Sequence, residues 1–99
     1  MDTTEKPRIL IVDDEQMVLD SFSSCFNSMG FQTICESESS KAIELIHNEE
    51  FDLVFLDLRM QPYDGFHILQ EIKKQDPFTT VIIISGFGDI ENAIEAVNK

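Results

Sequence analysis

The sequence has 99 residues, of which 42% are apolar and 26% charged, and this composition is ordinary for one small folded domain. Acidic residues outnumber basic ones by 19 to 7, so the net charge of −12 argues against direct nucleic-acid binding, which needs clusters of Lys and Arg. No apolar run is long enough to span a membrane, and the N-terminal segment MDTTEKPR lacks the apolar core of a signal peptide. We therefore expect a cytoplasmic protein that binds neither nucleic acid nor membrane.

The first predicted strand is Ile9–Val12, whose four consecutive apolar residues are typical of a strand buried on both faces. Two adjacent acids, Asp13 and Asp14, end it. A helix is predicted from Glu15 to about Met29, because apolar residues recur there at helical spacing and Gly30 follows as a typical helix stop. Its apolar stripe consists of Val18, Phe22, Cys25, Phe26 and Met29.

A second, weaker strand is predicted over Phe31–Cys35, where Gln and Thr dilute the apolar pattern. The next helix should run to about Glu49, with Ala42, Ile43 and Ile46 facing inward. Three serines are candidate N-caps for this helix, namely Ser37, Ser39 and Ser40. Neither cysteine of the chain lies in a metal-ligand spacing, so we expect both to be reduced packing residues.

The stretch Phe51–Gly65, which reads FDLVFLDLRMQPYDG, organises the rest of the chain. Leu53–Leu56 is apolar without alternation, so this third strand should be buried on both faces, with helices above and below it. The strand delivers a single carboxylate, Asp57, at its carboxyl end, which is where open α/β sheets bind their ligands.

Two further elements complete the pattern. A third helix is predicted before Pro77, with Phe66, Leu69 and Ile72 on one face, and Val81–Ile84 is the fourth strand, which stops at Ser85. A last helix could be capped by Asp89, with one apolar face made of Ile90, Ala93, Ile94 and Val97.

Strands that alternate with helices predict an α/β fold with a doubly wound parallel sheet and right-handed crossovers. The strand order 2-1-3-4 would bring Asp13, Asp14 and Asp57 together at one crevice. Three carboxylates within about 5 Å repel one another by roughly 1–3 kcal/mol per pair, so they invite a hard cation, and Mg²⁺ fits best. Taken singly, each Asp has a simpler reading as a helix cap or a turn former.

In combination these residues closely resemble the receiver domain of two-component response regulators, which has the flavodoxin-like fold. The resemblance covers Arg8 to Lys99. The segment VIIISGFGDIENAIEAV is most similar to receivers that precede enhancer-type ATPase domains. The matching positions are Asp13 and Asp14 (acid pair), Asp57 (phosphoacceptor), Met60, Asp64 and Gly65 (the following loop), and Ser85 (switch hydroxyl).

The resemblance implies that a sensor histidine kinase transfers a phosphoryl group to Asp57. It also implies that Mg²⁺ is held by Asp14, Asp57 and the backbone carbonyl of Arg59, with Asp13 acting through water. Ser85 would bind the phosphoryl group and switch an output domain, and Arg59 and Phe87 occupy positions that tune hydrolysis. A receiver of this kind is a phosphoacceptor that assists its own transfer and dephosphorylation, not a conventional enzyme.

Two departures from the family pattern stand out. Gln61 occupies the position where the family usually has proline, and Pro62 comes one residue later. The chain also ends at Lys99, before the fifth strand with its phosphate-binding lysine and coupling aromatic, and before the fifth helix. We therefore expect residues 1–99 to be a single receiver domain cut short at its C-terminus, with an output domain beyond it.

Other classes of protein fit the sequence less well than a receiver. An aspartyl phosphohydrolase would need Asp-x-Asp after the third strand, where this chain has Asp57-Leu58-Arg59, and a nucleotide binder would need a Gly-rich loop after the first strand. The serious alternative is a truncated fragment that only self-associates. Self-association is expected in any case, because the fourth strand would be an open apolar edge beside a partly uncovered sheet face.

Overall fold

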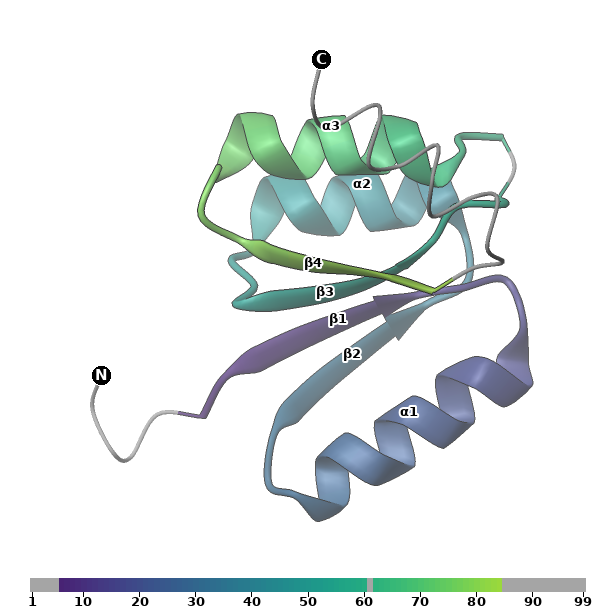
Figure 1. Cartoon of the computed structure of the whole chain (residues 1–99), viewed down its shortest axis with the longest axis vertical. Coiled ribbons are helices and arrows are strands. Elements are labelled where there is room, and N and C mark those ends of the chain that lie inside the picture. The colour runs from purple at the N-terminus through teal and green to yellow at the C-terminus, as the bar shows by residue number, and fades with distance from the viewer. Residues whose placement is uncertain (1–5, 61, 85–99) are drawn as a thin grey trace.

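The computed structural model describes residues 6–60 and 62–84, which form four strands and three helices in strict alternation (Figure 1). The elements are β1 Arg8–Val12, α1 Gln16–Ser28, β2 Gln32–Glu36, α2 Ser39–Asn48, β3 Leu53–Asp57, α3 Gly65–Gln75 and β4 Thr80–Ile84. The predicted strands are confirmed to within one residue at each end. The helix predicted around Asp89 lies outside the described residues.

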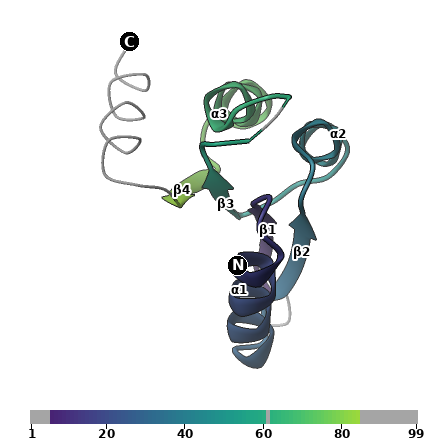
Figure 2. The ribbon, with the colours of Figure 1, turned by 90° about the vertical axis from the view of Figure 1, so that its right-hand side faces the viewer.

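The strands form one parallel sheet in the order β2-β1-β3-β4, which confirms the predicted order and the flavodoxin-like fold class. Helix α1 covers one face of the sheet, and α2 and α3 lie side by side on the other, as the two views in Figures 1 and 2 show. The strand order reverses at β1, because β2 lies on one side of it and β3 and β4 lie on the other. The carboxyl ends of β1 and β3 therefore flank the point where ligands bind in sheets of this kind.

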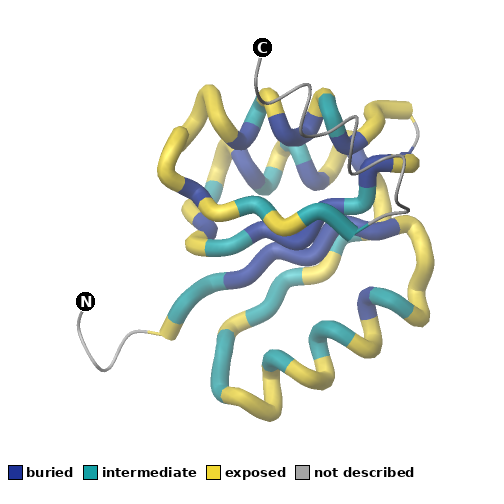
Figure 3. Tube along the Cα trace, viewed as in Figure 1, coloured by how far each residue is buried: buried dark blue, intermediate teal, exposed yellow. Residues whose placement is uncertain are grey.

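The two faces of the sheet have different cores. Beneath α2 and α3 the core is mostly aliphatic, with Leu10, Val12, Val54 and Leu56 of the strands packed against both helices. Beneath α1 it is largely aromatic, and Phe22 and Phe26 of the helix contact Phe55, with ring centroids 5.2 and 5.1 Å away. The central strands β1 and β3 are the most deeply buried part of the chain (Figure 3), as their unbroken apolar sequences predict.

The face of α1 differs in detail from the predicted stripe. Leu19, which was not assigned to that stripe, is the most buried residue of the helix, whereas Met29 is 60% exposed. The prediction that both cysteines are packing residues was wrong, because Cys25 and Cys35 are exposed. Gly30 does end the helix, with a backbone φ of +90° that a residue with a side chain would adopt only under strain.

The start of α2 also corrects a prediction. The N-cap position is Glu38, whose side chain makes no capping hydrogen bond, and Ser39 is already the first helical residue. None of the three serines therefore occupies the N-cap position proposed from the sequence. In the described part of the chain, no helix has the length and apolar character needed to cross a membrane.

Candidate functional site

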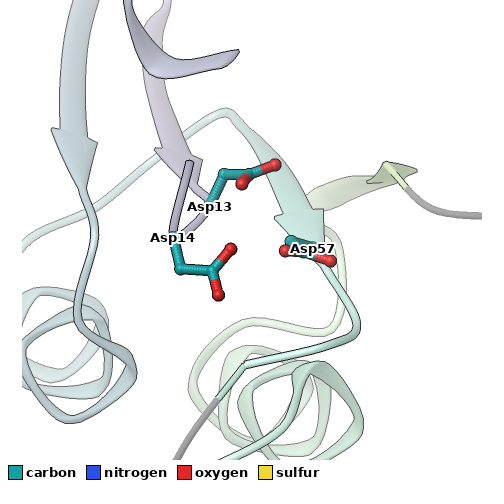
Figure 4. A group of neighbouring side chains, drawn as sticks. All are labelled: Asp13, Asp14 and Asp57. Atoms are coloured by element: carbon teal, nitrogen blue, oxygen red, sulfur yellow. The ribbon is translucent and has the colours of Figure 1, made fainter. Parts of the chain in front are cut away.

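Three acids predicted from the sequence do meet at the carboxyl edge of the sheet (Figure 4). Asp57 is the last residue of β3, and Asp13 and Asp14 directly follow β1. The two strands pair in parallel with Val12 opposite Leu56, so their carboxyl ends lie next to each other. One carboxylate oxygen from each acid lies within 4.8 Å of the other two.

Asp13 is the buried member of the group, with only 4% of its surface exposed. Its backbone N–H donates to the carbonyl of Glu36 at 3.2 Å, which joins the end of β1 to the end of β2. Its side-chain Oδ1 accepts a hydrogen bond of 2.8 Å from the backbone N–H of Glu15. Burial raises the pKa of Asp13, and the neighbouring charges of Asp14 and Glu15 raise it further, against the lowering effect of the Glu15 hydrogen bond.

Asp57 is half-buried, and its Oδ1 accepts a hydrogen bond of 3.0 Å from the backbone N–H of Arg59. Burial is the main cause that raises its pKa, and the charges of Asp13 and Asp14 add to the rise, while the Arg59 hydrogen bond opposes it. Two carboxyl groups of the site thus have raised pKa values. Their negative charges are poorly compensated by the protein itself.

The segment after Asp57 folds closely against the end of β3. The N–H of Gly65 donates to the carbonyl of Leu58 at 3.1 Å, and a Cβ at Gly65 would lie 2.6 Å from both the Asp57 carbonyl oxygen and the Leu58 Cα. Asp64 caps α3 by accepting from the N–H of His67 at 3.0 Å. Met60, 3% exposed, anchors the segment in the aliphatic core. The three loop positions singled out in the sequence thus all have structural roles.

One contact at this segment had no signal in the sequence. The backbone N–H of Tyr63 donates to the Oγ of Ser39 at 3.1 Å, across 24 residues of sequence. The aromatic ring of Tyr63 stacks on that of His67, with centroids 4.9 Å apart. Sequence reasoning assigned Ser39 to helix capping, because a serine near a helix start is most often a cap and no local pattern identifies a partner in another loop.

The donor atoms suit a hard divalent cation. Carboxylate oxygens are the ligands that Mg²⁺ and Ca²⁺ prefer. Burial is the main cause of the two raised pKa values, and a cation at this position would relieve the repulsion among the acids that adds to it. The backbone carbonyl of Arg59, two residues past Asp57, is the further ligand predicted. Ser85 and Phe87 lie outside the described residues. The hollow of about 320 Å³ found in the structure lies elsewhere, between the carboxyl-terminal ends of α2 and α3, and contains none of these acids.

Comparison with known proteins gives a consistent picture. Residues 9–99 match the response regulator receiver domain family. The chain is 37% identical over 90 residues to the regulatory protein AtoC of Escherichia coli. The aligned region covers 91% of this chain and 20% of AtoC. It is 34% identical over 96 residues to the alginate biosynthesis transcriptional regulatory protein AlgB of Pseudomonas aeruginosa, covering 96% of this chain and 21% of AlgB. The chain thus spans about a fifth of each of these relatives.

Solved structures agree. A response regulator receiver domain protein (CheY-like) from Methanospirillum hungatei superposes with a TM-score of 0.87 at 28% identity, over 95% of this chain and 75% of that one. NtrX from Brucella abortus superposes with a TM-score of 0.82 at 36% identity, over 95% of this chain and 21% of NtrX.

Proposed function

Because the chain belongs to the response regulator receiver domain family, we propose that it accepts a phosphoryl group on Asp57 and passes this signal to an output domain. The observation that supports the proposal most is the convergence of Asp13, Asp14 and Asp57 at the carboxyl edge. Asp57 is the acid delivered by the central strand β3, and its half-buried carboxylate is accessible from solvent.

We assign the metal site to Asp14, Asp57 and the backbone carbonyl of Arg59, with Asp13 acting through a water molecule. Mg²⁺ bound there would offset the negative charge of the phosphoryl oxygens. The protein's own part is to hold the acids in place. Asp13 is fixed by the Glu15 N–H, and Asp57 by the Arg59 N–H.

In the proposed reaction an oxygen of the Asp57 carboxylate attacks the phosphorus of a phosphohistidine on a sensor histidine kinase. A P–O bond forms as the P–N bond breaks, and the electron pair of that bond stays on the imidazole nitrogen, which is then protonated. The product is an acyl phosphate. Burial raises the pKa of Asp57, so the protein stabilises the charged carboxylate poorly. A bound cation would offset this charge together with that of the incoming phosphoryl group.

The decisive experiment is to incubate the protein with Mg²⁺ and acetyl phosphate and to measure its mass. One added phosphoryl group is expected on the parent and none on Asp57→Asn, which should keep the parent's circular dichroism spectrum. Asp20→Asn, on the exposed surface of α1, is the matched control and should be labelled like the parent. Equal labelling of Asp57→Asn and the parent would refute the assignment.

Ser85 is proposed as the switch hydroxyl that binds the phosphoryl group after transfer. Ser85→Ala should therefore still be phosphorylated but should show smaller amide shifts at residues 86–89 when beryllofluoride is added. Identical shifts in the parent and the alanine variant would exclude this role.

The proposed partners are a sensor histidine kinase in the cytoplasm, an output domain and a second copy of this chain. For self-association the relevant surface is β4, the edge strand of the described sheet, where Ile82 is 42% exposed on the same face as Phe55. Light scattering over a wide concentration range tests this part. A protein that stays monomeric throughout would exclude it, and one that associates without ever being phosphorylated would favour the alternative of an associating fragment.

A further inference from the structure

Ser39 is completely buried although it is the first residue of a surface helix. Its hydroxyl group does not cap α2. Instead, its Oγ accepts a hydrogen bond from the backbone N–H of Tyr63, in the segment that joins Asp57 to α3. A buried hydroxyl that leaves its own helix to bind the backbone of another loop holds that loop in one position.

The segment held in this way begins at the acid site. Near its start, the N–H of Arg59 donates to Oδ1 of Asp57, and near its end the N–H of Tyr63 donates to Ser39. The described residues before and after position 61 are therefore held by Asp57 on one side and by α2 on the other. Gly65, at the far end of the segment, packs directly against the backbone of Asp57 and Leu58, so this end has little room to move.

We propose that Ser39 is a positioning residue for the acid site, which fixes the segment after Asp57 in the conformation needed to bind the cation, and which also ties this segment to α2. The inference rests on the proposed function of Asp57. The Ser39 hydroxyl group does not contact the acid site. It nevertheless contributes to the affinity of that site for the cation.

The physical reason is the cost of an unpaired N–H. Without the Oγ acceptor, the Tyr63 N–H must either stay unpaired in a partly buried place or move outward to reach water. Outward movement of Tyr63 is expected to displace Arg59 as well, because only three residues separate them in the sequence. The Arg59 N–H then holds Asp57 less firmly, and the carbonyl proposed as a metal ligand shifts with it. Small displacements of this kind have large effects on preorganised sites.

The chain contains a built-in reporter for this movement, because Tyr63 is its one tyrosine and it has no tryptophan. Tyrosine fluorescence therefore reports on this segment alone. In the absence of metal, acrylamide should quench Tyr63 more strongly in Ser39→Ala than in the parent. Ser40→Ala, which removes the exposed hydroxyl of the adjacent residue, is the matched control and should behave like the parent.

The second measurement is the Mg²⁺ concentration that gives half of the maximal thermal stabilisation. We expect it to rise at least threefold in Ser39→Ala and to stay unchanged in Ser40→Ala. Ser39→Thr keeps the hydroxyl group, so its half-stabilising Mg²⁺ concentration should equal that of the parent. A general loss of packing around position 39 would raise this concentration in Ser39→Thr as well. The proposal is overturned if Ser39→Ala matches the parent in both measurements, or if Ser39→Thr behaves like Ser39→Ala.

Mass measurement after acetyl phosphate treatment separates this inference from the proposed function. If the parent is never labelled, the phosphoacceptor proposal fails, whereas the quenching of Tyr63 still tests the role of Ser39. If all variants are labelled at saturating Mg²⁺ but share one half-saturating concentration, the inference about Ser39 fails and the function of Asp57 stands.

Discussion

The two ends of the sheet treat charge in opposite ways. At the carboxyl end, Asp13, Asp14 and Asp57 bring like charges together, and two of them have raised pKa values. At the amino end, Arg8 is surrounded by acceptors and by an aromatic ring. Its contacts are Glu49 Oε1 at 2.5 Å, the Glu50 carbonyl at 3.1 Å, the Asp52 carboxylate at 2.8 Å from its backbone N–H, and the Phe51 ring centroid at 5.1 Å.

Both ends are built on the same strands, β1 and β3, so the difference does not come from the fold. It comes from the residues placed where the strands stop. Charges at the amino end are paired, whereas those at the carboxyl end repel one another and would be balanced by the cation proposed there. The deeply buried middle of β1 and β3 stabilises the fold, and this allows the carboxyl end to hold an unfavourable arrangement of charges.

The largest effect is expected from adding a methyl group at Gly65, where the backbone at the carboxyl end of β3 is already in close contact. In Gly65→Ala the new Cβ would lie 2.6 Å from the Asp57 carbonyl oxygen and from the Leu58 Cα, both of which are backbone atoms that cannot turn away. We expect a loss of about 2–4 kcal/mol in the free energy of unfolding, measured with urea. Mg²⁺ binding should weaken as well. A variant as stable as the parent would show that the end of β3 can move freely.

The carboxyl-end half of this contrast could be predicted from the sequence, because it follows from where strands end. The pairing around Arg8 was not predicted. The unbroken apolar runs of β1 and β3 identify buried strands, and the parallel order places Asp13, Asp14 and Asp57 together without further information. Gly65 could be placed in the loop. Its close contact with the β3 backbone could not, because that contact depends on how the loop closes in three dimensions.

Other features were beyond sequence reasoning for similar reasons. The role of Ser39 depends on a partner 24 residues away, and the exposure of Cys25 and Cys35 depends on how α1 is rotated and on β2 being an edge strand. Helical periodicity marks an apolar side, but it does not fix that side to within one residue. This is why Leu19 was not assigned to the stripe and Met29 was.

The second prediction is that removing a charge stabilises the carboxyl end. Asp13→Asn keeps an oxygen to accept from the Glu15 N–H but removes a buried charge near Asp14 and Asp57. In metal-free buffer at pH 7 we expect a gain of about 1–2 kcal/mol in the free energy of unfolding. Saturating Mg²⁺ should stabilise the parent more than the variant and so reduce this gain.

Glu49→Gln is the matched control at the amino end, where the carboxylate is paired with Arg8. Its expected effect has the opposite sign, a loss of up to about 1 kcal/mol, because the pair is about one-third exposed. If both substitutions were destabilising in metal-free buffer, the description of the carboxyl end as uncompensated would be wrong.

The third prediction concerns pH and has a definite sign. Because the pKa values of Asp13 and Asp57 are raised above the ordinary 3.8, the folded state binds protons more tightly than the unfolded state. The stability contributed by the protonated groups is fully present below pH 3.8 and is lost as the pH rises through the raised values. The gain from Asp13→Asn should therefore be near zero at pH 3 and reach its full size by pH 7. Urea unfolding of both proteins across this range, without metal, measures the difference, and a gain independent of pH would rule out charge as its cause.

The smallest effect is expected from the amino end, where the charges are paired but partly in solvent. Arg8→Met keeps an apolar side chain but removes the guanidinium group, which pairs with Glu49 and lies over the Phe51 ring. Since the side chains of Arg8 and Glu49 are 33% and 37% exposed, solvent screens the pair, and we expect a loss of only about 0.5–1 kcal/mol in urea unfolding. High salt should reduce the loss further. The control is Lys41→Met, at the more exposed pair with Glu38, whose effect should be smaller still. The contrast between the two ends would be wrong if Arg8→Met changed the free energy of unfolding by more than Gly65→Ala and Asp13→Asn do. The amino end would then be the more tightly constrained end of the sheet.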